Sequence, residues 1–164
     1  MFRKLLIRSA LVVLGVLALI QVLPYGRAHD TPPILKEPAW DCAATRELAR
    51  RACFDCHSNE TRWPWYAHVA PVSWLVQHDV EEGRSKLNFS EWSRPQHEAD
   101  EAEEVVREGE MPPYAYVALH SSAHLTAQET LQLAQGLART LGSRGERREL
   151  TKADEDDAEA HAER

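Results

Sequence analysis

The sequence predicts a mostly α-helical protein, in which an N-terminal apolar helix precedes one small helical domain. Residues 98–108 and 127–141 carry apolar side chains at the spacing of an amphipathic helix. Residues 1–23 are a third helical segment, because a long apolar run follows basic residues there. No segment shows the strand–helix alternation of a parallel sheet. With 164 residues, the chain has the length of one domain with terminal extensions.

Residues 1–23 predict a helix that crosses a membrane. Arg3, Lys4 and Arg8 come first, and an apolar run from Ala10 to Leu23 brings the segment close to the roughly 20 residues that span a bilayer. The basic flank places the N-terminus in the cytoplasm. A cleaved signal peptide has a similar pattern, so a retained single-pass anchor, which we favour, and a cleaved leader are alternatives. Both place the domain outside the cytoplasm, which in a bacterium is the periplasmic face of the inner membrane.

Two polar segments flank the predicted domain, residues 40–142. Residues 24–39 are a proline-rich linker, expected to be an extended spacer in which His29 is solvated. Residues 143–164 are charged and poor in apolar side chains, which is typical of a disordered acidic tail. The net charge of −7 gives no basic footprint for binding nucleic acid.

The most specific chemical feature is the sequence Cys53-Phe54-Asp55-Cys56-His57. Residues three and four apart share one face of a helix, so both thiols and the imidazole point the same way. The C-x-x-C-H spacing is the attachment signature of a c-type haem, with Cys53 and Cys56 forming thioethers and His57 binding the iron. A zinc site needs two further ligands at finger-like spacing, and a thioredoxin-like pair needs a βαβ context. One covalent haem c is therefore the predicted cofactor.

A helix is expected to begin at Asp41 and to run into this motif. Cys42, the third cysteine, is either a small buried residue or the partner of an intermolecular disulfide. A short helix over residues 71–79 and a turn at Gly83 are expected next.

A haem pocket needs aromatic and aliphatic walls, because a porphyrin is large, flat and apolar. The wall candidates are Trp63, Trp65, Tyr66, Val72 and Trp74. Arg84 and Asn88 are candidate hydrogen-bond donors to the haem propionates, since a buried carboxylate needs such partners.

The predicted sixth ligand of the iron is Met111. It follows the helix of residues 98–108 and Gly109, a residue suited to end that helix, and it precedes Pro112. The residue before a proline prefers an extended backbone, so the thioether is expected on a stiff loop that reaches the iron. His120 and His124 are alternative ligands.

A capping box at Thr126 and Glu129 predicts the start of the last helix. Gly142 ends it. The residues expected on its apolar face are Leu131, Ala134, Leu137, Ala138 and Leu141.

Several blocks in chain order resemble the haem-binding domain family of bacterial cytochrome-c-like proteins, over residues 40–141. These blocks are residues 53–61, 63–66, 70–74, 83–84, 88–92, 109–112 and 116–120. The resemblance implies a covalent haem c in a mostly α-helical, cytochrome-c-like fold, usually behind an N-terminal anchor. It places the motif cysteines and histidine on Cys53, Cys56 and His57, and the Met-Pro element on Met111. It implies neither a partner nor a reaction.

The function expected from these features is that of a membrane-anchored monohaem c-type cytochrome, which carries single electrons and is not an enzyme. Ligation by His57 and Met111 leaves no open site on the iron. The expected partner is another redox protein at the membrane, and the oligomeric state is not predicted. A haem-based gas or redox sensor, or a peroxidase-like accessory domain, is the alternative. An assembly protein is a third interpretation.

Overall fold

The computed structural model describes residues 2–143, and the predicted acidic tail lies outside them except for its first residue. The mostly α-helical class is confirmed, because the described residues form seven α-helices and no strand longer than an isolated bridge between Lys36 and Glu91. The α-helices are α1 (Phe2–Ile20), α2 (Ala43–Ala52), α3 (Phe54–His57), α4 (Val72–Lys86), α5 (Ala102–Arg107), α6 (Tyr114–Leu119) and α7 (Ala127–Leu141). The 3-10 helices are η1 (Trp65–His68), η2 (Ala99–Glu101) and η3 (Ser121–Ala123).

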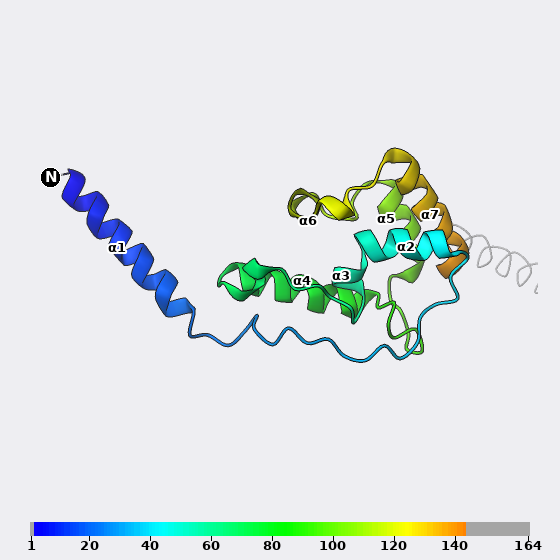
Figure 1. Cartoon of the computed structure of the whole chain (residues 1–164), viewed down its shortest axis with the longest axis horizontal. Helices are drawn as coiled ribbons and strands as arrows, with labels where there is room; N and C mark the ends of the chain where they lie inside the picture. Colours follow the sequence, from blue (N-terminus) through cyan, green and yellow to red (C-terminus); the bar gives the residue numbers. More distant parts are fainter. Residues whose placement is uncertain (1, 144–164) are drawn as a thin grey trace, which may run out of the picture.

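Helix α1 projects away from the other helices, as Figure 1 shows, and none of its residues is buried. Within residues 2–143, no helix combines the length and the apolar composition that crossing a membrane requires. The expected transmembrane helix is therefore not found. The physical reason lies in the composition of α1, whose first two turns carry Arg3, Lys4 and Arg8.

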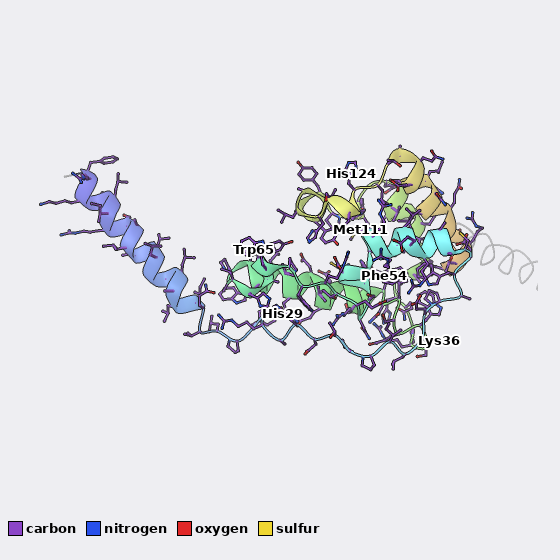
Figure 2. The ribbon with its side chains drawn as sticks, in the orientation of Figure 1. His29, Lys36, Phe54, Trp65, Met111 and His124 are labelled. Carbon is purple, nitrogen blue, oxygen red and sulfur yellow. The ribbon has the colours of Figure 1, made fainter. Side chains whose placement is uncertain are left out.

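The linker after α1 lies against the helical body instead of forming a free spacer. The ring of His29 stacks on Trp63 with 4.4 Å between centroids, so the prediction of a solvated His29 is wrong. The backbone amides of Leu35 and Lys36 both donate to the carbonyl of Ser90, at 2.9 and 3.1 Å. In Figure 2, His29 and Lys36 mark the path of the linker along one edge of the domain.

Helix α2 begins one residue later than expected, with Cys42 as its N-cap. The carboxylate of Asp41 instead accepts a hydrogen bond from Arg139 Nε of α7, at 2.9 Å. Cys42 is exposed, with its Sγ 3.3 Å from Thr45 Oγ1, so it is not the buried residue that we expected.

The core lies where α2, α5 and α7 pack together. A Cβ added to Gly136 of α7 would lie 2.1 Å from Oγ1 of the buried Thr45, so glycine allows α2 and α7 to approach closely at this point. The buried apolar residues of this core are Leu48, Ala49, Ala52, Phe54, Leu87, Phe89, Ala99, Ala102, Val106, Leu133, Ala134 and Leu137.

The capping box at the start of α7 is confirmed, since Glu129 N donates to Thr126 Oγ1 at 3.2 Å and Thr126 N donates to Glu129 Oε2 at 2.8 Å. The predicted apolar face is partly wrong. Leu131 is 51% exposed, whereas Leu133 is fully buried. The buried face is the one that α2 and α5 cover. It includes Gly136, which has no side chain and therefore does not contribute to an apolar pattern in the sequence.

Candidate haem site

The motif Cys53–His57 lies where α2 meets α3. Cys53 is both the C-cap of α2 and the N-cap of α3. Its side chain packs against the apolar core. Burial raises the pKa of Cys53 to about 12 and that of Cys56 to about 11. A reactive disulfide-exchange cysteine has a lowered pKa, so burial of these thiols argues against a thioredoxin-like pair.

The imidazole of His57 is held by two backbone carbonyls. Its Nδ1 lies 3.1 Å from Gly83 O and 3.1 Å from Leu87 O, at the C-terminal end of α4. A nitrogen that faces carbonyl oxygens must carry the proton, so the lone pair is on Nε2. Burial lowers the pKa of His57 and favours the neutral form, which is the form that binds a metal. This arrangement fixes both the tautomer and the ring orientation of His57, as hydrogen-bond partners do for a metal-binding histidine.

Gly83 lies inside α4, so the predicted turn at this residue is wrong and the helix continues to Lys86. A Cβ added at Gly83 would lie 2.7 Å from the carbonyl oxygen of Cys56. The absence of a side chain is therefore required by the close approach of α3 to α4 and not by a turn. This contact brings the Gly83 carbonyl within reach of His57.

A cavity of about 390 Å³ opens beside the motif, within the usual range for a small-molecule site. Residues of α3, α4 and α6 line it, and Figure 1 shows α6 across from α4, with α3 beside α4 and below α2. Large apolar side chains face this cavity although they are exposed to solvent, among them Leu75 at 61% and Leu119 at 67%. Exposed apolar surface of this kind marks a binding site.

Met111 lines the cavity, as expected. The chain leaves α5 through Gly109, whose φ of +77° is the left-handed conformation that ends a helix. The amides of Glu110 and Met111 then donate to the carbonyl of Val105, at 2.9 and 3.1 Å. Figure 2 shows Met111 next to α2 on the side of α6. His120 also lines the cavity, whereas His124 does not.

The structure brings only part of the predicted site together. Cys56, His57, Tyr66, Val72 and Met111 line the cavity. The predicted site residues that do not line it are Cys53, Trp63, Trp65, Trp74, Arg84 and Asn88. Trp63 stacks on His29, and Trp65 is 79% exposed at the end of the domain nearest α1 (Figure 2).

Arg84 and Asn88, the predicted propionate donors, have partners within the protein. Arg84 Nε donates to Ser58 O at 2.9 Å, and Arg84 Nη2 donates to Thr61 Oγ1 at 3.0 Å. Asn88 is buried and its Nδ2 donates to Asn59 Oδ1 at 2.9 Å. Both residues therefore support the loop that follows the haem motif.

Sequence reasoning missed two contributors to the cavity. The first is the rest of the apolar face of α4 beyond the predicted Val72, formed by Leu75, Val76 and Val80. Its three- and four-residue spacing was a visible signal. The second is Tyr116, which donates to Oδ2 of the buried Asp55 at 2.6 Å. These two residues are 61 positions apart, and no local pattern predicts their contact.

The residues of the site fit a haem. A largely apolar cavity suits the porphyrin. Cys56 lines the cavity and Cys53 lies three residues before it, at the spacing of a thioether pair. The imidazole of His57 and the thioether of Met111 are known types of haem ligand. The fold and the site together define a small helical protein of the haem-binding class.

The chain belongs to the haem-binding domain family. The family model described as "Haem-binding domain" matches residues 15–139. This match begins inside α1 and includes the linker, in agreement with the contacts that the linker makes with the domain. Neither the curated proteins nor the solved structures include one that matches the chain.

Proposed function

We propose that this protein is a monohaem c-type cytochrome that carries single electrons and performs no chemical conversion. Cys53 and Cys56 would hold haem c covalently, and His57 and Met111 would bind its iron. The observation that carries the proposal is the state of His57, whose Nδ1 is anchored to two carbonyls while its Nε2 stays free, beside an apolar cavity that Met111 also lines.

When bound, the haem supplies a one-electron iron couple, and the residues of the chain set its properties. The carbonyls of Gly83 and Leu87 orient His57, and burial favours its neutral form by lowering its pKa. A methionine ligand raises the reduction potential relative to a second histidine. The apolar face of α4 would cover one side of the bound haem. Because His57 and Met111 would together leave no open position on the iron, electron transfer is favoured over the sensor or peroxidase alternatives.

We also propose that the domain functions on the periplasmic side of a bacterial inner membrane, where its partner is another redox protein. The basic residues and apolar run of residues 1–23 support export, because this order is typical of targeting segments. We expect the haem-bearing chain to be recovered from periplasmic or membrane fractions of an expressing bacterium. Its recovery from the cytoplasm alone would contradict this location.

Met111→Ala tests the axial ligation. The wild-type ferric protein is expected to be low-spin, with a charge-transfer band from methionine to iron, and the variant is expected to lose this band and to bind carbon monoxide readily when reduced. His124→Ala is the matched control, because His124 does not line the cavity, and its spectrum should be unchanged. If the wild type is already high-spin and binds carbon monoxide, electron transfer loses its support and the sensor alternative gains it.

A further inference from the structure

The segment from Met111 to His120 forms one wall of the cavity, yet it is loosely packed. Helix α6 has no buried residue. Within residues 2–143, two side-chain hydrogen bonds connect this segment to other elements. Both involve a tyrosine hydroxyl: Tyr116 with Asp55, and Tyr66 with His120.

The first hydrogen bond joins α6 to the haem motif. Asp55 lies between the two motif cysteines and is 7% exposed. Its Oδ2 accepts from Tyr116 at 2.6 Å, and its Oδ1 accepts from the backbone amide of Arg62 at 3.1 Å. Because Tyr116 is five residues after Met111, with Pro112 and Pro113 between them, this bond restrains the position of the Met111 loop relative to the motif.

The second hydrogen bond involves the other possible iron ligand. His120 Nδ1 lies 2.9 Å from the carbonyl of Tyr116 and therefore carries the proton. Its Nε2 then accepts from the hydroxyl of Tyr66, at 3.1 Å. The ring also stacks on Tyr116, with 4.1 Å between centroids. His120 is thus in the same tautomer as His57 and lines the same cavity, but its ligating nitrogen is occupied by Tyr66.

We propose that Tyr66 and Tyr116 act as positioning residues that select Met111 over His120 as the sixth ligand of the iron. Tyr116 holds the methionine loop against the motif, and Tyr66 occupies the lone pair of His120. This inference rests on the proposed function, because it requires a bound haem. Both a thioether and an imidazole bind haem iron, so the type of ligand does not decide between Met111 and His120. We assign that choice to the hydroxyl groups of the two tyrosines.

Tyr66→Phe is the main test, because it removes the hydroxyl and keeps the ring. We expect loss of the methionine charge-transfer band, a low-spin spectrum with two nitrogen ligands and a lowered reduction potential. The double variant Tyr66→Phe/His120→Gln should regain the band, because residue 120 then offers no imidazole to the iron. Tyr114→Phe is the matched control, since Tyr114 is 88% exposed, and it should resemble the wild type.

Tyr116→Phe tests the other half of the selection. We expect a weakened methionine band and faster carbon monoxide binding, together with faster proteolysis between residues 111 and 120 in the haem-free protein. If wild-type protein shows the band and both single variants keep it at full strength, the inference is wrong and the proposed function stands. If wild-type protein holds no covalent haem, the proposed function fails and the inference fails with it.

Discussion

The Cys53→Ser/Cys56→Ser double variant is expected to lose covalently attached haem completely. A serine hydroxyl does not replace a thiol in forming a thioether with a haem vinyl group. Both cysteines are removed together because one remaining thioether is enough to hold some haem on the chain. The measurement is haem-dependent peroxidase staining of the denatured polypeptide, after expression with the cytochrome c maturation system.

Cys42→Ser is the matched control for this experiment. Cys42 is exposed at the start of α2 and does not line the cavity, so its replacement should leave haem attachment at the wild-type level. Persistence of covalent haem in the double variant would contradict the assignment of the motif. Loss of haem in Cys42→Ser would show that the spare cysteine takes part in attachment.

Gly83→Ala is expected to destabilise the domain and to disturb His57. The added methyl group would lie 2.7 Å from the carbonyl oxygen and 3.1 Å from the Cβ of Cys56, so α3 and α4 must move apart. Overpacking of this kind costs about 1–3 kcal/mol. Alanine gains about 1 kcal/mol in helix propensity over glycine, and the clash with rigid backbone outweighs it. The free energy of unfolding, measured by denaturant titration, reports the net effect.

Movement of α4 also displaces the Gly83 carbonyl that lies 3.1 Å from His57 Nδ1. In the haem-bound variant we therefore expect a changed spectrum of the iron as well as reduced stability. Ser85→Ala is the control, because Ser85 is exposed on the same helix and should change the free energy of unfolding by less than about 0.5 kcal/mol. Gly83→Ala with wild-type stability would show that the helices adapt at this contact.

Local patterns predicted much of the fold. The spacing of apolar residues and the capping box located α7, and the C-x-x-C-H motif predicts where haem is attached. Such patterns succeed because helix geometry and thioether spacing depend on residues a few positions apart. The same reasoning failed for α4, where Gly83 indicated a turn from sequence but allows a helix contact in the structure.

The wall of the cavity was predicted less well, for a physical reason. The aromatic residues after the motif were reasonable wall candidates, yet only Tyr66 among them lines the cavity. Whether an aromatic side chain faces a ligand or an ordinary core depends on which helix covers it. Trp63 packs on His29 of the linker, a contact across 34 positions that composition does not indicate.

The sequence by itself determined the helical class. It also predicted the haem-attachment residues and paired His57 with one downstream methionine as candidate ligands. Only the tertiary structure decided the environment of those ligands. It placed Nδ1 of His57 against the carbonyls of Gly83 and Leu87, and it brought Tyr116 within hydrogen-bond distance of Asp55. It also placed His120, but not His124, in the lining of the cavity. The reason is that a ligand type is a property of one residue. Its orientation and its competition with other ligands depend on contacts between elements distant in the chain.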